Sequence, residues 1–366
     1  MARILFTVCG VGLGHCMRSM PLIDYLQKEG HEIFLSSYGE SQKFLKKKFS
    51  KVGSLKWFDL LFDKDQYKRT KTILYNLPSA PRVIASNFLS LLKLVREFKP
   101  DVIVSDFDFN SSLIGFMQNI PVIILSNMHM MEYNPIEMSV KDKIDYALKE
   151  RPIIHGFARM DSLFVLGFVK PRSLPKKAKF FFHPVRKEVL EKKPLKKGFF
   201  LVYLSDGQVD SMLSLLKRFR DKKFVVVGTK PKHNIPNNAK FRPLDQDSFA
   251  KDLAECNGVL SHGGISLICE SLYLKKPVYT FTSKSFFERY YNGKVVEENG
   301  MGLLEEKPSF EGLEKFFSRI SEFEKNIEKN SFVPDSEELK KELSLMINEL
   351  VKKQANAKLA SPFWMP

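Results

Sequence analysis

The chain has 366 residues, which is more than one hydrophobic core usually supports, so we expect two domains of similar size. Hydrophobic residues at 44% and charged residues at 27% are ordinary for a globular protein. No run approaches the roughly 18 apolar residues of a membrane-spanning helix, which excludes that class. The amino-terminal stretch 1–10 lacks the long apolar region and cleavage site of a secretory signal, so we expect a cytoplasmic protein.

The charge is strongly basic, with 58 Lys and Arg against 42 Asp and Glu, a net charge of +16. Such an excess favours anionic partners: nucleic acids, anionic membrane surfaces or phosphorylated substrates. The lysines occur in short scattered runs, without the stripe or aromatic signature of a nucleic-acid-binding module, so we expect no nucleic-acid partner. The four cysteines have no CxxC spacing, which indicates reduced thiols in an intracellular protein.

Apolar β-rich runs alternate with amphipathic helical stretches, a pattern typical of parallel sheets covered by helices. In the first half, strands are expected at 3–10, 31–37, 101–106, 120–127 and 162–169, with helices at 17–30 and 86–100. A stretch rich in Lys and Pro follows and predicts a linker. In the second half, strands are expected at 199–205, 223–228, 258–264 and 277–282, with helices near 209–220, 247–256 and 265–274.

These patterns divide the chain into a first Rossmann-like domain, a linker, a second Rossmann-like domain, and a terminal helix and tail, at 1–169, 170–185, 186–335 and 336–366. The terminal helix places Leu339, Leu343 and Ile347 on one face, and Asp335 with Glu338 has capping-box spacing at its start. Ligands in open parallel sheets bind at the carboxyl ends of the strands, so we expect the chemistry in a cleft between the two sheets.

The first motif is GVGLGH, in which Gly12 and Gly14 allow a ligand to approach the backbone before a helix begins. A dinucleotide site would need the spacing GxGxxG and an acidic residue ending the next strand, but that strand ends in Ser36 and Ser37. His15 is a candidate general base, because imidazole titrates near neutrality. The alternative is a structural histidine, and Arg18, one turn on, is an acceptor contact or a helix-surface group.

The second motif is the strand 101–106, which ends in Asp106. A carboxylate there can orient His15 and stabilise its protonated form, or it can cap a loop.

A third candidate group lies in the segment 125–134, where His129 stands among three methionines. Adaptable thioethers suit an amphiphilic acceptor, although the same residues can pack a core.

The most specific motif is SHGGISLICESLYLKKP at 261–277. A strand ends, two glycines open a bend, and a helix starts with free N–H groups that suit a pyrophosphate. The donor-binding candidates here are a histidine for the phosphate, the glycine turn, a hydroxyl and a carboxylate that accepts from both ribose hydroxyls: His262, Gly263, Gly264, Ser266 and Glu270. Further donor-binding candidates lie after neighbouring strands, at Ser205, Glu288, Arg289 and Asn292.

At these residues the sequence resembles the GT-B glycosyltransferases, near the UDP-glycosyltransferases and the enzyme that adds N-acetylglucosamine to lipid-linked muropeptide. The resemblance covers most of the chain and implies two Rossmann-like domains facing across a cleft. It implies that His262 and the Gly263–Gly264 turn hold the pyrophosphate, that Glu270 holds the ribose, and that His15 is the base with Asp106 as its partner. Lys275 stands where relatives usually have Gly.

The resulting hypothesis is an inverting, metal-independent glycosyltransferase that uses a UDP-sugar and no cofactor. We expect no Asp-x-Asp sequence that would hold a metal ion on the diphosphate, so the helix after Gly264 would stabilise the charge on the leaving diphosphate instead. The resemblance assigns the acceptor to residues 1–169 and the nucleotide sugar to residues 186–335. The acceptor is a glycan, lipid or small molecule, and a basic chain with 32 Phe residues suits peripheral contact with the inner face of an anionic membrane. Two alternatives remain: a non-hydrolysing sugar-nucleotide 2-epimerase, and a non-catalytic protein that binds anions or nucleic acid.

Overall fold

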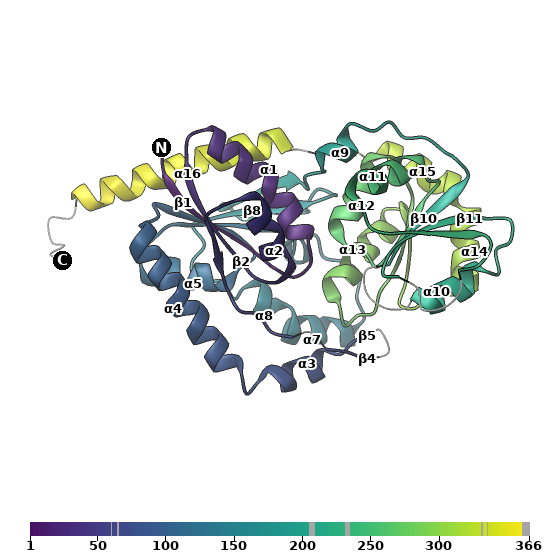
Figure 1. Ribbon diagram of the computed structural model, residues 1–366, viewed down its shortest axis with the longest axis horizontal. Helices are drawn as coiled ribbons and strands as arrows, with labels where there is room; N and C mark the ends of the chain where they lie inside the picture. Colours follow the sequence, from purple (N-terminus) through teal and green to yellow (C-terminus); the bar gives the residue numbers. More distant parts are fainter. Residues whose placement is uncertain are drawn as a thin grey trace. The chain divides into compact units, whose positions relative to one another are not determined.

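The computed structural model describes residues 1–59, 61–63, 66–204, 209–230, 235–330, 332–334 and 336–360. Two compact units are found: the first holds Met1–Asp59, Leu74–His183 and a carboxyl-terminal helix, and the second holds the described residues of 60–73 and 184–334. Each unit contains one all-parallel sheet covered by helices (Figure 1). No helix among the described residues is long and apolar enough to cross a membrane.

The sheet of the first unit has seven strands. In spatial order they are β3 (Val52–Ser54), β2 (Glu32–Ser37), β1 (Arg3–Val8), β6 (Val102–Asp106), β7 (Val122–Ser126), β8 (Ser162–Gly167) and β9 (Ala178–Phe182). Strands β6, β7 and β8 are buried along their whole length, as expected for central strands covered on both faces. Strands β2 and β3 are added on one side of β1, and the strands from β6 onward are added on its other side. The strand order therefore reverses between β1 and β6, and the carboxyl ends of these two strands form the switch point of the sheet.

Helices flank this sheet on the chain segments between its strands. They are α1 (Gly14–Lys28), α2 (Gly39–Lys48), α3 (Arg69–Asn76), α4 (Ala80–Phe98), α5 (Phe109–Met117), α6 (Met130–Tyr133), α7 (Val140–Lys149) and α8 (Arg151–Ile154). Helix α3 spans the boundary between the units, and next to it the short strands β4 (Phe62–Asp63) and β5 (Gln66–Tyr67) form an antiparallel hairpin. Helix α4 begins six residues before the expected start at 86, with Pro81 in its first turn, where a missing N–H costs nothing.

The carboxyl-terminal helix α16 (Ser336–Ala360) packs on the first sheet and runs beside α1 (Figure 1). Its residues Leu339, Leu343 and Ile347 are fully buried in the same core as strand β1. Each such burial contributes on the order of 1.5–3 kcal/mol, so this helix is an integral part of the first unit. The amphipathic prediction is confirmed, whereas the predicted capping residue Asp335 lies outside the described residues.

The sheet of the second unit has six strands. In spatial order they are β12 (Ala239–Arg242), β11 (Lys223–Gly228), β10 (Phe199–Leu204), β13 (Val259–Ser261), β14 (Val278–Phe281) and β15 (Gly302–Glu305). Its helices are α9 (Lys187–Leu190), α10 (Val209–Leu216), α11 (Gln246–Glu255), α12 (Ile265–Tyr273), α13 (Phe287–Glu298), α14 (Phe310–Ser318) and α15 (Ile320–Lys329). The switch point of this sheet lies between β10 and β13.

The expected strands and helices of both halves are present, and the boundary between the first unit and the expected linker differs. The stretch 170–185, expected to be a linker, contains β9, which pairs with β8 in parallel register and is the last strand of the first sheet. Its sequence, AKFFF, follows a run of Lys and Pro that conceals it. The first unit therefore extends to His183.

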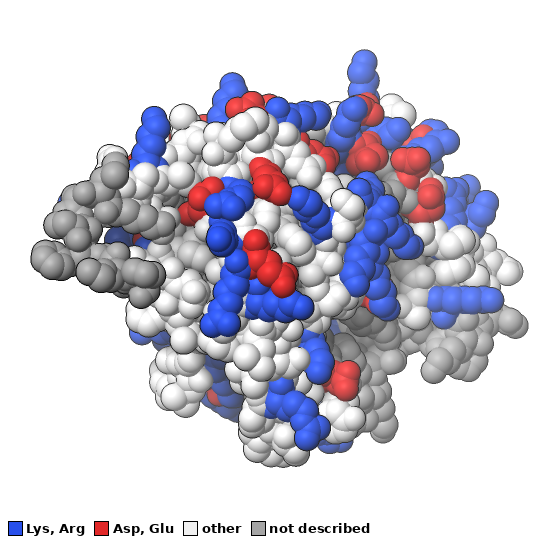
Figure 2. All heavy atoms as spheres, turned by 60° about the vertical axis from the view of Figure 1, so that its left-hand side comes forward, with Lys and Arg blue, Asp and Glu red and all other residues white. Residues whose placement is uncertain are grey.

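The basic side chains are scattered over the surface, as the short separate runs of lysine in the sequence indicate. On the face drawn in Figure 2, Lys and Arg are spread over the surface and stand among fewer Asp and Glu. Several exposed lysines pair with acids one helical turn away, such as Lys43 with Glu40 and Lys149 with Asp145. Such exposed pairs contribute little to stability, so most of this charge is a solvated surface.

Candidate functional site

The glycine loop at 10–14 connects β1 to α1, and two of its glycines are required by the backbone. A Cβ on Gly10 would lie 2.0 Å from the carbonyl oxygen of Tyr38, so only Gly fits where this loop passes the end of β2. Gly12 has a φ of +69° and is exposed. Helix α1 then begins at Gly14, which places His15 in its first turn at the switch point of the sheet.

Asp106 reaches the same point from the end of β6. The parallel pairing of β1 with β6 aligns Val8 with Asp106, and the backbone N–H of Cys9 donates to the carbonyl oxygen of Asp106. The Asp106 side chain is completely buried. His15 and Asp106, which are 91 positions apart in the sequence, are thereby brought together as predicted, with 2.9 Å between Nδ1 and Oδ1.

The Asp106 carboxylate is surrounded by donors. Arg18 donates from Nε to Oδ2 at 3.0 Å and from Nη2 to Oδ1, and Ser19 donates its hydroxyl to Oδ2 at 2.6 Å. Arg18 also donates to the side-chain oxygen of Asn127 at 2.8 Å. Arg18 is only 3% exposed, so the predicted acceptor contact is instead a buried guanidinium that fixes Asp106.

When the His15 ring is neutral, this arrangement decides which of its nitrogens carries the proton. A carboxylate only accepts, so the hydrogen bond to Asp106 requires Nδ1–H. The 2.9 Å between Nδ1 and the Arg18 guanidinium is then a contact between two donors. Nε2 is left as the nitrogen that can accept a proton, and the His15 side chain retains 16% exposure.

The charges around His15 shift its pKa strongly. Burial alone would lower the pKa of His15, but the negative charges of Cys9 and Asp106 outweigh burial and the Arg18 charge, and raise this pKa to about 10. Burial alone would raise the pKa of Cys9, but the His15 charge and hydrogen bonds from His15 and Tyr38 lower it. Burial also opposes ionisation of Asp106, yet the charges of Arg18 and His15 hold its pKa well below the usual range.

Asp108 has a separate role. It is the N-cap of α5 and accepts from the backbone N–H of Ser111 at 3.0 Å. The expectation that the chain has no Asp-x-Asp sequence is wrong, because residues 106–108 form one, and this pattern can hold a metal ion against a diphosphate. Here one carboxylate is occupied by Arg18 and the other caps a helix, so the two do not face a common site.

His129 lies at the end of the neighbouring strand β7 but inside the protein. It is 1% exposed, and its Nδ1 is 2.8 Å from the hydroxyl of Ser126. Burial and the nearby His155 lower the pKa of His129 to about 4, so it is neutral at pH 7. Met130 and Met131 are also buried. The core-packing alternative therefore describes these residues in the structure, and none of them offers an exposed acceptor contact.

In the second unit, the turn between β13 and α12 has the predicted form. Gly263 has a φ of +82°, and a Cβ there would lie 2.7 Å from the carbonyl oxygen of Arg289. Gly264 is the N-cap of α12 and is exposed, and no described atom would contact a Cβ built on it within 4 Å. Open space therefore lies beside Gly264 at the start of this helix, whose first N–H groups have no partner within the helix, and Ser266 is half-buried.

The other predicted donor residues lie around this turn, and one of them, Asn292, supports it by a hydrogen bond. Asn292, on α13, donates from Nδ2 to the carbonyl oxygen of Gly263 at 3.1 Å. His262 is 8% exposed, and its ring packs edge-on against Phe281. Arg289 lies over the ring of Phe286, at 4.6 Å from guanidinium carbon to ring centroid. Glu288 is half-buried at the start of α13, and Ser205 lies outside the described residues.

Glu270 is held by a residue that the sequence did not single out. Both of its carboxylate oxygens accept from Arg186, from Nε at 2.5 Å and from the terminal nitrogen at 2.8 Å. Glu270 is 3% exposed, and the Arg186 side chain is 17% exposed. Arg186 immediately precedes α9 at the start of the second unit. A single Arg that follows a strand in a Lys-rich segment gives little signal in the sequence.

Comparisons with known proteins identify the class. Residues 2–321 match the family described as glycosyl transferase family 1, and the chain belongs to this family. An uncharacterized glycosyltransferase of Methanosarcina mazei is 26% identical over 343 residues, which covers 82% of this chain and 85% of that protein.

Solved structures define the fold. The calicheamicin glycosyltransferase CalG4 is similar with a TM-score of 0.64 and 15% identity, over 95% of this chain and 98% of that chain. MurG of Acinetobacter baumannii is similar with a TM-score of 0.60 and 12% identity, over 93% and 99% of the two chains. The predicted GT-B fold is confirmed, as is the prediction that the chain is a glycosyltransferase.

The buried charge cluster gives a stability prediction. Asp106→Asn removes the carboxylate that compensates Arg18, which is 3% exposed, and we expect a loss of about 3–5 kcal/mol in the free energy of unfolding. Asp108→Asn is the matched control, because Asn also caps helices and should cost less than about 1 kcal/mol. Urea unfolding of both variants checks this. Equal losses would show that Arg18 does not depend on the Asp106 charge.

Proposed function

We propose that this member of glycosyl transferase family 1 transfers a sugar from a nucleotide diphosphate sugar, with UDP as the expected nucleotide, to an acceptor hydroxyl with inversion. The observation that carries the proposal is the start of α12, where a left-handed glycine turn leaves an exposed, uncapped Gly264. Backbone N–H groups and the helix dipole at such an end favour a diphosphate. The same groups would stabilise the charge that develops as the diphosphate leaves.

Glu270 is proposed to bind the ribose beside this diphosphate. It lies on α12, and its carboxylate has about four lone-pair positions, of which Arg186 occupies two. The remaining positions can accept from ribose hydroxyls. Arg186 holds the plane of the carboxylate by a two-point contact, which fixes the direction of the free lone pairs. Arg186 is therefore a positioning residue for the ribose.

His15 is proposed as the general base on the first unit. The hydrogen bond to Asp106 leaves Nε2 to take the proton of the acceptor hydroxyl. The acceptor oxygen forms a bond to the anomeric carbon, while the bond from this carbon to the diphosphate oxygen breaks and its electrons leave with the diphosphate. Asp106 would stabilise the imidazolium that results. Arg18 and Ser19, which fix Asp106, support this role.

Metal independence is part of the same proposal. The carboxylates of the Asp-x-Asp sequence at 106–108 are committed to Arg18 and to the cap of α5. The charge on the diphosphate would instead be stabilised by the start of α12 and by His262. The 2-epimerase and the non-catalytic binding protein gain no support from the family match, which names glycosyl transfer.

The acceptor remains a glycan, lipid or small molecule in this proposal, with a lipid-linked acceptor supported by one surface. Helix α7 has no buried residue, and its apolar positions Val140, Ile144 and Leu148 are 75%, 54% and 72% exposed. These positions lie four residues apart and form one stripe along the helix. A helix with such a stripe can lie on a membrane surface with the apolar face buried.

The donor proposal is tested by comparing UDP with 2′-deoxy-UDP. If Glu270 accepts from the ribose, the wild-type protein binds UDP more tightly, and Glu270→Gln reduces the ratio of the two affinities toward one, because the charge-assisted hydrogen bond is lost. Isothermal titration measures both dissociation constants. Glu311→Gln, at an exposed position of α14, is the matched control and should keep the ratio. No binding of UDP, or an unchanged ratio in Glu270→Gln, would contradict the assignment.

The base proposal requires a neutral imidazole, and the titration of His15 tests which group sets the fraction of the ring that is neutral. A base must be neutral, and the pKa of about 10 keeps most of the imidazole protonated at pH 7. Cys9 is the largest of the groups that raise this pKa, so Cys9→Ser should lower it toward 6.5 and increase the neutral fraction at pH 7.

NMR of the imidazole signals across pH follows the titration without a known substrate. Cys256→Ser, a buried cysteine of the second unit, is the control and should leave the His15 titration unchanged. A His15 pKa that stays in place or rises in Cys9→Ser would show that Cys9 does not set it.

A further inference from the structure

An exposed tryptophan lies beyond the carboxyl edge of the first sheet. Strand β3 ends at Ser54, and Trp57 follows three residues later with 39% of its surface exposed. Tryptophan is highly buried on average in proteins, and the carboxyl edge of a parallel sheet is where ligands bind. Neither the proposed base nor the proposed donor site uses this residue.

The ring of Trp57 is held from one side by a second ring. It stacks on Tyr38, with 4.2 Å between the ring centroids and 10° between the ring planes. Tyr38 is buried, and its hydroxyl lies 3.1 Å from the sulfur of Cys9. The Tyr38 ring also fills the space beside Gly10, where a Cβ would lie 2.4 Å from ring carbon Cδ2. One face of the Trp57 ring therefore rests on a closely packed support.

Two buried asparagines hold the backbone on either side of Trp57. Asn87, on α4, accepts from the backbone N–H of Lys56 at 2.8 Å and donates to its carbonyl oxygen at 2.9 Å. Asn76, the last residue of α3, makes the same pair of bonds to Asp59, at 3.1 Å and 2.8 Å. Both asparagine side chains are less than 10% exposed. Trp57 is thus ordered before a ligand arrives, which lowers the entropic cost of binding.

Trp57 and the proposed base lie along the same edge of one sheet. Cys9, Tyr38 and Trp57 follow the carboxyl ends of β1, β2 and β3, which are neighbours in the first sheet. The glycine loop then leads from Cys9 to His15 in the first turn of α1. An acceptor that reaches His15 can therefore extend along this edge onto the ring of Trp57.

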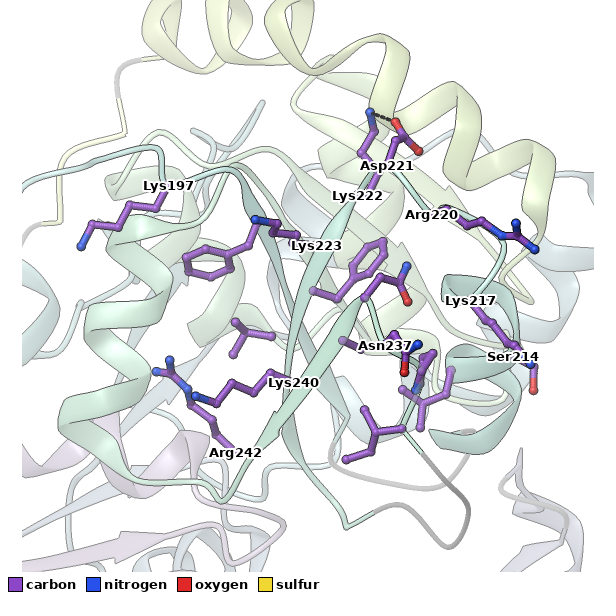
Figure 3. Close-up of a pocket in the computed structure, with 18 residues that line it drawn as sticks. Lys197, Ser214, Lys217, Arg220, Asp221, Lys222, Lys223, Asn237, Lys240 and Arg242 are labelled. Atoms are coloured by element: carbon purple, nitrogen blue, oxygen red, sulfur yellow. Dashed lines mark hydrogen bonds and ion pairs between the residues drawn. The ribbon is translucent and has the colours of Figure 1, made fainter.

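The cavity of the second unit lacks such an arrangement. It has a volume of about 1150 Å³ and lies at the amino ends of β10, β11 and β12, where its lining is rich in Lys and Arg. Figure 3 shows Lys217 on one side of these strands and Lys240 on the other, so these cations do not converge on one ligand. The fixed ring of Trp57 is the feature that points to a ligand.

The chemistry around Trp57 fits a sugar ring. The face of an indole carries the negative side of its quadrupole, and the C–H groups on one face of a sugar ring are polarised by the neighbouring oxygens, so the two faces attract. The hydroxyls at the edge of the sugar need polar partners, and Ser54, Lys56 and Asp59 are all exposed beside Trp57. A lipid tail on this surface would desolvate the same polar groups without replacing their hydrogen bonds.

We propose that Trp57 is a stacking surface for a sugar ring of the acceptor, so that the acceptor is a saccharide or carries one next to the reacting hydroxyl. The inference rests on the proposed function, because it assigns the acceptor of that reaction. Trp57 determines specificity in this assignment. It positions the acceptor and takes no part in proton transfer.

The first test probes an array of immobilised mono- and oligosaccharides with the full chain, with and without UDP. We expect wild type to bind a subset of them and Trp57→Ala to bind the same subset about tenfold more weakly, because a central aromatic contact is lost. Trp57→Phe keeps an aromatic face and should lie between the two. Phe116→Ala is the matched control and should keep the wild-type affinity. Phe116 is 62% exposed near the end of α5, which leads back to the amino end of β7.

The second test places the bound saccharide on the ring. The chain has two tryptophans, so Trp57 is the only one left in Trp364→Phe. The saccharide that binds most tightly to the array is titrated into this variant. We expect the fluorescence of Trp57 to move to shorter wavelength, because the sugar excludes water from the exposed face.

Several results would overturn the proposal: binding of no saccharide, an emission of Trp57 that is unchanged at saturation, or a wild-type affinity in Trp57→Ala. Equal losses in Trp57→Ala and Phe116→Ala would also overturn it. Isothermal titration with UDP separates this inference from the proposed function. Trp57→Ala should bind UDP as wild type does. Absence of UDP binding to wild type would contradict the proposed function, whereas saccharide binding lost only in Trp57→Ala would still support the stacking surface.

Discussion

The uncapped start of α12 is the constraint on which the donor half of this account depends. A helix begins with backbone N–H groups that have no partner within the helix, and among the described residues no side chain caps Gly264. The fold makes this possible with the left-handed turn at Gly263, which packs against the backbone of Arg289 and is held by Asn292. The turn is therefore rigid, and the groups that face a ligand are fixed before the ligand arrives.

The first unit has the same sheet topology, but its switch point holds a histidine–carboxylate pair. The carboxyl ends of β1 and β6 meet at the switch point, which brings His15 to Asp106. A buried carboxylate is costly unless it is paired and hydrogen-bonded, and Arg18 and Ser19 satisfy this requirement. The network selects the ring tautomer of His15 and also binds β6 to α1. Stability and the proposed catalysis share this one carboxylate.

Much of this arrangement is predictable from the sequence because it follows local patterns. Buried strands are recognisable as apolar runs, one of which ends in Asp106, and a glycine turn marks the start of the helix that carries Glu270. The partners of these carboxylates are not predictable in that way, because Arg18 and Arg186 lie 88 and 84 positions away. The position of Asn127 near Asp106 could have been predicted, because Asn127 follows the end of β7, which lies next to β6. The strand β9 was missed because basic residues and Pro precede it.

The central claim is that a nucleoside diphosphate lies against the start of α12, and a crystal structure of the protein soaked with UDP tests it most directly. The account predicts phosphate oxygens within hydrogen-bond distance of the backbone N–H groups that follow Gly264, with the ribose hydroxyls reaching Glu270 while Arg186 keeps its two-point contact. A nucleotide bound elsewhere, or a Glu270 that contacts only Arg186 beside an occupied site, would contradict it.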